Sequence, residues 1–323
     1  LAMLMLLTTP LAPSFRQGAG ARAHRARAGR PCLPPNAAAP FPPSRFPVPV
    51  CHAKALPLGK SGAGRGKGRT TVRVVGRGGG GGTLERTWSN PEGNVLTKVA
   101  ENVWAAERPF VWNTIDVGGK MAVVRLKGGG LWVHSPVDLD DSLRREIDAL
   151  GPVEHIVSPN FEHLKYAKQW IDAYPGATSY GCPGLLALKP ETGYDVELKG
   201  SEVPAAWGGE VVCQSFAGVE HNPFTRRPFF NEVVFMHVPT GTLVVTDLFW
   251  NYPSDVPGGT KLWKFGMDQV YLPFYSSLMI CDRTQYERAV SGVLSWEWDA
   301  LLPCHGHYLP RGGKKAFRDH LGA

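Results

Sequence analysis

The stretch HIVSPNFEHLKYAKQW, residues 155–170, decides the fold that we predict for this chain. It begins with a short apolar run, passes through the polar corner SPNFEH at residues 158–163, and continues with apolar residues at helical spacing. The pattern predicts a strand over residues 154–157 followed by a helix over residues 162–173. Polar side chains that follow a strand often line the binding crevice of an α/β protein, so a site is expected at this corner.

The segments on both sides of this corner also alternate between strand and helix patterns. Residues 94–107 suggest two short strands that turn at Asn102, and residues 122–126 and 131–133 suggest a hairpin around three glycines. A helix should follow at about residues 141–150, with Asp138 or Asp140 as its N-cap and Gly151 as its stop. Strands are expected within residues 177–185 and 210–218.

A second hairpin is predicted within residues 229–252, where PTG at positions 239–241 forms the turn. The last part, residues 261–320, combines helical patterns with one apolar run, WDALLPCHGH. Antiparallel hairpins interleaved with strand–helix units favour sheets that are covered by helices. We therefore predict an α/β sandwich that forms one domain over residues 88–323.

Residues 1–87 differ sharply in composition from the remainder. Residues 1–86 contain 14 Lys or Arg and a single acid, Glu85, whereas the remaining residues contain 21 basic and 27 acidic ones. The formal net charge of +7 therefore comes entirely from the N-terminal part, and the predicted domain is mildly acidic. A nucleic-acid-binding function, which a basic pI would otherwise favour, is excluded on this ground.

The N-terminal part is typical of a targeting segment. An acid-poor, Arg-rich composition is characteristic of organelle transit peptides, and the Gly-rich run at 76–83 is typical of a linker. We interpret residues 1–87 as a disordered chloroplast transit peptide with its linker; the alternative is a disordered tail that has no targeting function. No later stretch reaches 18 apolar residues, so we expect a soluble protein that does not bind membranes.

The cysteines of the predicted domain are widely spaced and form no CxxC pair: Cys182, Cys213, Cys281 and Cys304. This spacing indicates neither a disulfide framework nor a zinc ribbon. We expect four buried free thiols, which is the common state of intracellular cysteines.

Five segments contain polar residues in an order that resembles a known family. They are HSP at 134–136, the corner at 155–163, His221 in AGVEH, Asp247 after the strand pattern TLVVT, and His305 in LLPCHGHYL. Over residues 92–310 the order is similar to that of the metallo-β-lactamase superfamily, and specifically to a divergent plastid branch of unknown function. The resemblance implies an αββα sandwich with a metal site along one edge.

The first metal-binding motif of that superfamily, His-x-His-x-Asp-His, is eroded here, and two registers are open. In the first, His163 takes the final His position and Glu162 takes the Asp position, while Asn160 and Ser158 replace the leading histidines. In the second, Pro159 and Phe161 fall on the histidine positions, His163 on the Asp and Leu164 on the last His. Pro and Phe have no ligand atom, so the second register leaves a poorer site.

Under the first register the resemblance implies at most one divalent metal, Zn, Fe or Mn. The candidate ligands are Glu162, His163, His221, Asp247 and His305, among which Asp247 and His305 are also the candidate catalytic residues. Each has a simpler interpretation: Asp247 can cap a turn, and Glu162 can be an acid favoured by a helix dipole. We interpret His134 as a structural histidine with its hydrogen bonds satisfied.

The resemblance implies metal-dependent hydrolysis of an ester, thioester or similar acyl bond in a small-molecule substrate. The alternative is a catalytically inactive relative that binds a small molecule or a protein partner in the same cleft, with or without a metal. Both remain open at this point, because a fold can persist after its activity is lost.

Overall fold

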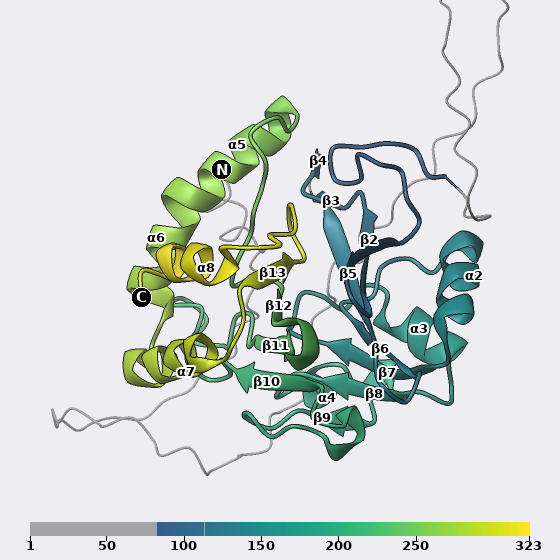
Figure 1. Ribbon diagram of the computed structural model, residues 1–323. Coiled ribbons are helices and arrows are strands. Elements are labelled where there is room, and N and C mark those ends of the chain that lie inside the picture. The colour runs from purple at the N-terminus through teal and green to yellow at the C-terminus, as the bar shows by residue number, and fades with distance from the viewer. Residues whose placement is uncertain (1–82, 113) are drawn as a thin grey trace, which may run out of the picture. The chain divides into compact units, whose positions relative to one another are not determined.

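Two β-sheets lie face to face, with helices along the outer side of each (Figure 1). The computed structural model describes residues 83–112 and 114–323. The predicted transit peptide and almost all of the predicted linker lie outside these described residues.

The first sheet has seven strands in the order β1-β2-β5-β6-β7-β8-β9. Its first four strands pair antiparallel, and β6 to β9 pair parallel. The predicted strand pair and first hairpin are both present, and Asn102 and Gly129 occupy the turns with φ of 57° and 92°. The strands are β1 (Thr97–Ala100), β2 (Val103–Arg108), β5 (Gly119–Arg125), β6 (Leu131–His134), β7 (Val153–Ser158), β8 (Thr178–Gly181) and β9 (Val196–Glu197).

The second sheet has four strands in the order β10-β11-β12-β13, and its last pair is parallel. The second predicted hairpin is confirmed as β11 and β12, joined through a 3₁₀ turn η3 (Val238–Thr240) and Gly241. The strands are β10 (Val211–Ser215), β11 (Val233–His237), β12 (Thr242–Val245) and β13 (Ala300–Pro303). A separate two-stranded ribbon is formed by β3 (Val111–Trp112) and β4 (Ile115–Asp116).

The helices follow the predicted positions, with one exception given below. Asp140, not Asp138, is the N-cap of α2, where its side chain accepts hydrogen bonds from the backbone N–H groups of Ser142 and Leu143. Residues 258–279 form a nearly continuous helix that includes two π-helical stretches, η4 and η5. The helical elements are α2 (Asp141–Leu150), α3 (Ala167–Ala173), α4 (Leu185–Leu188), η1 (Pro190–Thr192), η2 (Ala205–Trp207), α5 (Gly258–Gly266), η4 (Met267–Tyr271), α6 (Leu272–Phe274), η5 (Tyr275–Met279), α7 (Arg283–Ser295) and α8 (Gly313–Leu321).

Three apolar clusters correspond to the three interfaces of the layered fold. Between the sheets, Trp132 of β6 packs edge-on against Phe235 of β11, with ring centroids 5.1 Å apart. Ile147 of α2 and Trp170 of α3 cover the outer face of the first sheet, and Phe317 of α8 belongs to the cluster on the outer face of the second sheet. This arrangement confirms the predicted αββα sandwich.

The helix predicted at residues 162–173 begins only at Ala167. Residues 161–166 form turns, because the side-chain oxygen of Asn160 accepts hydrogen bonds from the N–H groups of Glu162 (3.0 Å) and His163 (2.9 Å). A short polar side chain that bonds to the next backbone N–H groups stabilises a turn in competition with a helix. The corner is therefore longer than the sequence pattern suggests.

Two predictions about individual side chains are wrong. Cys281 is exposed, whereas Cys182, Cys213 and Cys304 are buried as expected. His134 is fully buried, but neither of its ring nitrogens has a hydrogen-bond partner among the described residues. It stacks on Trp132, and burial lowers its pKa to about 3, so the ring is neutral. No helix within residues 83–112 and 114–323 combines the length and the apolar character needed to cross a membrane.

Candidate metal centre

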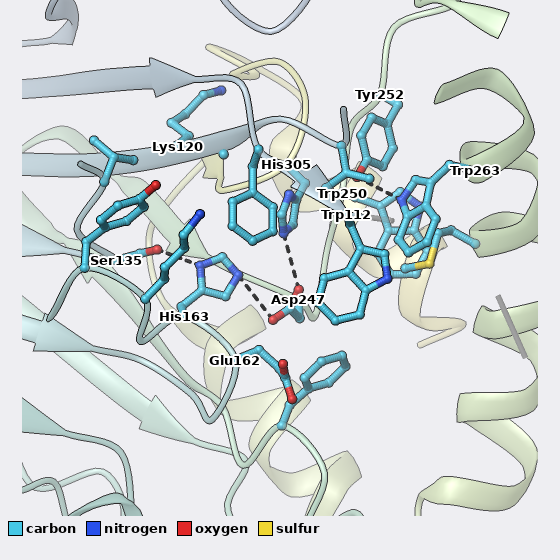
Figure 2. Close-up of a pocket in the computed structure, with 18 of the residues that line it drawn as sticks. Trp112, Lys120, Ser135, Glu162, His163, Asp247, Trp250, Tyr252, Trp263 and His305 are labelled. Atoms are coloured by element: carbon cyan, nitrogen blue, oxygen red, sulfur yellow. Dashed lines mark hydrogen bonds and ion pairs between the residues drawn. The ribbon is translucent and has the colours of Figure 1, made fainter. Parts of the chain in front are cut away.

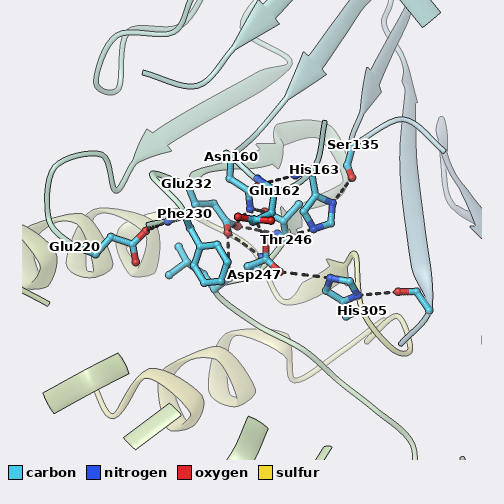
Figure 3. Close-up of polar contacts among 12 residues, drawn as sticks. Ser135, Asn160, Glu162, His163, Glu220, Phe230, Glu232, Thr246, Asp247 and His305 are labelled. Atoms are coloured by element: carbon cyan, nitrogen blue, oxygen red, sulfur yellow. Dashed lines mark hydrogen bonds and ion pairs between the residues drawn. The ribbon is translucent and has the colours of Figure 1, made fainter. Parts of the chain in front are cut away.

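Three polar side chains meet at the edge where the carboxyl ends of the parallel strands of both sheets lie together (Figure 3). His163 comes from the corner after β7, Asp247 from the segment after β12, and His305 from the segment after β13. One ligand atom from each of the three lies within 4.8 Å of the others. These residues are 58 or more positions apart from their neighbours in sequence, so only the packing of the sheets brings them together.

The separations within this group fit a single metal ion. His163 Nε2 lies 3.3 Å from Asp247 Oδ2, and His305 Nε2 lies 3.4 Å from Asp247 Oδ1. Two donor atoms that each bind one tetrahedral zinc ion at about 2.0–2.1 Å are about 3.4 Å apart. Two imidazoles and one carboxylate, with a position left for water, are also a common ligand set of catalytic zinc.

Both imidazoles are held by a second hydrogen bond that directs Nε2 toward Asp247. His305 Nδ1 donates to the carbonyl oxygen of Gly118 at 2.8 Å, and His163 Nδ1 lies 2.6 Å from the hydroxyl of Ser135. Because a carbonyl oxygen only accepts, a neutral His305 presents the lone pair of Nε2 to the carboxylate. Two lone pairs facing each other require a positive charge between them, either a proton or a metal ion.

Asp247 is fixed by a buried network on its other side (Figure 3). Asn160 donates its side-chain amide to Asp247 Oδ2 at 2.6 Å. The carboxylate of Glu232 accepts from the backbone N–H groups of Thr246 (2.7 Å), Asp247 (2.8 Å) and Leu248 (3.1 Å). Asn160 and Glu232 are both almost completely buried. The backbone at the end of β12 is therefore held by one carboxylate, which directly precedes the neighbouring strand β11.

The charges of this cluster shift one another's pKa values. Burial alone would raise the pKa of Asp247, but His163 and His305 outweigh it and hold that pKa well below its usual range. Burial alone would lower the pKa of His163, but Asp247 outweighs it and raises that pKa. Burial and the charge of Asp247 together raise the pKa of Glu232 to about 7.

Two of the five predicted ligands do not join this group. Glu162 lines the same pocket but is exposed; desolvation by the pocket walls and the charge of Asp247 raise its pKa to about 7. His221 lies elsewhere, because its backbone N–H bonds to the carbonyl of Met279 and its Nδ1 lies 2.8 Å from Cys281 Sγ. The pairing of residues 219–221 with residues 279–282 keeps this imidazole away from the centre.

Both sequence registers place His163 on a ligand position, and His163 is one of the three converging residues; the first register also assigns positions to Asn160 and Ser158. In that register Asn160 and Ser158 stand where the superfamily motif has its leading histidines. Asn160 points into the centre as a hydrogen-bond donor to Asp247, whereas the hydroxyl of Ser158 accepts a hydrogen bond from Tyr194 at 2.7 Å. Neither side chain is placed as a second set of metal ligands.

A pocket of about 260 Å³ opens beside the three residues (Figure 2). His163, Asp247 and His305 all line it. Half of the other residues that line it are aromatic, and they include Trp112 of β3, Trp263 of α5 and Phe230. The buried carboxylate of Glu220 fixes Phe230, since it accepts a hydrogen bond from the Phe230 backbone N–H at 2.7 Å.

The roles of Glu232 and of the Ser135 hydroxyl, and the gathering of aromatic rings at the pocket, were not predicted from the sequence. Glu232 directly precedes the apolar strand β11, and an acid at such a position is a signal for a buried polar contact. Ser135 has a left-handed φ of 54°, an unusual conformation for a non-glycine residue that is frequent at functional sites. The aromatic wall comes from segments far apart in the sequence and has no local signal.

Comparison with solved structures gives the same fold. The DIM-1 metallo-beta-lactamase exposed to ceftazidime superimposes with a TM-score of 0.50 and 17% sequence identity, covering 70% of this chain and 94% of the other. A metallo-beta-lactamase from Pontibacter korlensis gives a TM-score of 0.48 and 14% identity, covering 70% and 96%. The first comparison supports a metallo-β-lactamase-like fold and, at this identity, nothing finer.

None of the curated proteins matches the chain. One family, described as "Domain of unknown function (DUF4336)", matches residues 100–269, which include β2 to β12 and two of the three residues of the centre, His163 and Asp247. Because this match spans more than half of the 323 residues, the chain belongs to the DUF4336 family.

Proposed function

We propose that this protein is a metal-dependent hydrolase that uses one divalent ion, Zn, Fe or Mn, to cleave an ester, thioester or similar acyl bond. The observation that supports this most strongly is the convergence of ligand atoms of His163, Asp247 and His305 to within 4.8 Å at the wall of a pocket. In this proposal these three residues are the ligands, and Asp247 and His305 contact the reacting groups.

The hydrogen bonds of His163, Asp247 and His305 fit a role of these residues as metal ligands. Ser135 and the carbonyl of Gly118 fix the two imidazoles, and Asn160 fixes the carboxylate, as outer partners of metal ligands commonly do. A bound divalent ion would supply Lewis acidity, which polarises an acyl carbonyl and acidifies water. Glu162 lines the pocket close enough for Asp247 to raise its pKa, and among the described residues that line the pocket it is the exposed carboxylate that could exchange a proton with bound water or product.

A second candidate function is binding without catalysis. Asn160 stands where the superfamily motif has a histidine, and its amide already satisfies one oxygen of Asp247. An asparagine in place of a metal-binding histidine favours a protein that binds a small molecule or a protein partner in the pocket without catalysis. The two candidates differ in whether the centre, loaded with a metal ion, cleaves an acyl bond; a centre that binds no metal ion excludes the first.

We also propose that residues 1–87 direct the protein to the chloroplast. The acid-poor, Arg-rich composition of this part supports the proposal, and because the remainder is mildly acidic, the net positive charge of the chain lies in this part alone.

Metal analysis of the purified full chain separates the two functions. The chain is prepared without chelator, incubated in turn with Zn²⁺, Fe²⁺ and Mn²⁺, and freed of excess ion. We expect close to one ion per chain for the unmodified protein and less than about a tenth of that for Asp247→Ala, because loss of one of three ligands weakens binding strongly. Hydrolysis of methyl and thioethyl esters is then measured in the loaded protein.

His221→Ala is the matched control, since it removes a histidine that the sequence suggested as a ligand but that lies outside the group. This variant should keep the metal content of the unmodified protein. Circular dichroism checks that each variant is folded. Equal, substoichiometric metal in the unmodified chain and in Asp247→Ala would refute the hydrolase and favour the binding function.

A further inference from the structure

The pocket has one wall made largely of aromatic rings from distant parts of the chain. Trp250 and Tyr252 come from the segment after β12, Trp263 from α5, Tyr271 from η4, and Trp112 from the β3–β4 ribbon. In Figure 2, Trp250, Tyr252 and Trp263 gather on one side of Asp247, whereas Ser135 and Lys120 lie on the other. We call Trp112, Trp250, Tyr252, Trp263 and Tyr271 the aromatic wall.

Hydrogen bonds at their polar edges fix the orientation of three of these rings, those of Trp250, Tyr252 and Trp263, whereas the buried hydroxyl of Tyr271 has no partner among the described residues. Trp250 Nε1 donates to Asp268 Oδ1 at 2.7 Å, and Trp263 Nε1 donates to the hydroxyl of Tyr252 at 3.2 Å. The indole N–H groups of Trp250 and Trp263 are thus used within the protein, and these two rings present apolar surface to the pocket. A wall of this kind is preformed and binds a ligand without a large ordering cost.

The aromatic wall is continuous with the metal centre. The ring of Tyr252 lies nearly parallel to the imidazole of His305, with centroids 6.5 Å apart and an interplanar angle of 24°. A ligand group that contacts Tyr252 is therefore next to a residue whose Nε2 faces Asp247. The wall is placed to position the part of a substrate that adjoins the bond to be cleaved.

The cationic groups of the pocket are already engaged by the protein. Lys120 Nζ lies 3.0 Å from Glu107 and also donates to the carbonyl of Gly306. Lys165 Nζ lies over the rings of Phe110 and Tyr166, at 5.2 and 5.0 Å from their centroids. Lys120 is therefore ion-paired, whereas Lys165 is exposed and has no acid partner among the described residues; the aromatic wall itself contains no cationic group and offers apolar surface for recognition.

Trp112 is 43% exposed although it is a large apolar side chain on a short ribbon. Exposed indoles at the rim of a pocket are characteristic of binding sites. The pocket, at about 260 Å³, is slightly smaller than the roughly 300–1,000 Å³ of sites for drug-sized ligands, which limits the ligand to a compact molecule.

From this geometry we infer that the aromatic wall is a binding subsite for a phenyl-sized ring, and that the substrate is a small uncharged ester or thioester whose acyl part contains such a ring. The assignment of an ester or thioester rests on the proposed hydrolytic function. The binding of the ring does not, because the aromatic wall requires no metal.

Binding of two matched amides to the metal-free full chain tests the subsite. The probes are 2-phenylacetamide and cyclohexylacetamide, which have the same number of heavy atoms, bear no charge and resist hydrolysis. Calorimetry in the presence of chelator should give roughly two- to tenfold tighter binding of the phenyl compound, because aromatic pairs gain about 0.5–1.5 kcal/mol beyond area burial.

Trp263→Leu should abolish this preference. The matched control is Phe265→Leu, because Phe265 is on the same helix, is 61% exposed and does not line the pocket; the preference should persist in it. If Trp263→Leu does not fold, Trp112→Leu at the exposed rim replaces it. Equal affinity for the two amides, or an unchanged preference in the folded wall variant, would overturn the subsite.

Hydrolysis separates a failure of the subsite from a failure of the proposed function. Methyl phenylacetate and methyl cyclohexylacetate are compared with the metal-loaded full chain by titration of released acid. Equal hydrolysis of both esters would leave the hydrolase intact and overturn the subsite. Wall-dependent binding of 2-phenylacetamide without hydrolysis of either ester would support the subsite and count against the hydrolase.

Discussion

At the scale of single residues, the position of Asp247 depends on groups that are not themselves candidate ligands. Glu232 accepts hydrogen bonds from three consecutive backbone N–H groups, those of residues 246–248, and so fixes the chain on both sides of Asp247. A buried carboxylate is costly unless such donors compensate it. Glu232, which directly precedes β11, therefore fixes the position of the Asp247 carboxylate in the centre.

We expect Glu232→Gln to destabilise the protein by about 2–3 kcal/mol, because the amide nitrogen would face backbone N–H donors and leave them unsatisfied in the interior. The same change should lower metal occupancy, since Asp247 loses its fixed position. Urea denaturation and metal analysis measure the two effects. Glu287→Gln, a change of the same kind on the exposed side of α7, should alter stability by less than about 0.5 kcal/mol. Equal stability of the two variants would contradict this role of Glu232.

At the scale of elements, the corner after β7 and the segment after β13 are both shaped by local backbone constraints. The side chain of Asn160 holds residues 161–166 in turns, which delays the start of α3 and places His163 in the centre. Gly306, next to His305, has φ +84° and lies against the backbone of Asn251. A Cβ atom at this position would lie 2.1 Å from the Asn251 carbonyl oxygen.

Gly306→Ala should therefore destabilise the protein by roughly 3 kcal/mol or more and displace His305, because the chain must separate from Asn251. Gly312→Ala is the matched control. Gly312 also has a positive φ of 73°, but an added Cβ atom would meet nothing within 4 Å, so only the conformational cost of about 1 kcal/mol is expected. Thermal unfolding and metal content are compared for the two variants. Similar losses of stability would show that the close approach to Asn251 is unimportant.

At the scale of the whole molecule, the separation of charge along the chain suggests separate roles for its two parts. The net positive charge lies before residue 87, and the remainder is mildly acidic.

Fusion of residues 1–87 to a fluorescent protein should direct it to plastids in plant cells. Replacement of the six arginines in residues 1–50 by glutamine should abolish this, because the positive charge of a transit peptide is part of its signal. Fluorescence in the cytosol from the unmodified fusion would refute the proposed chloroplast targeting.

Much of the fold was predictable because its signals are local. The period-2 and period-3.6 patterns, the turn glycines and the Asp140 cap each depend on neighbouring residues, and they located both hairpins, α2 and the strands beside the corner. The start of α3 was predicted too early because the bond from Asn160 to two backbone N–H groups competes with helix propensity.

The sequence by itself determined the layered α/β architecture, and together with the family resemblance it predicted a site along one edge with five candidate ligands, among them His163, Asp247 and His305. Only the tertiary structure decided that these three converge, that His221 pairs with Cys281 instead, and that Glu232 and the aromatic wall surround the centre. The reason is physical. A hydrophobic period reports which face of an element is buried, whereas a ligand set depends on how strand ends from two sheets align, and that alignment is fixed by packing between residues far apart in the chain.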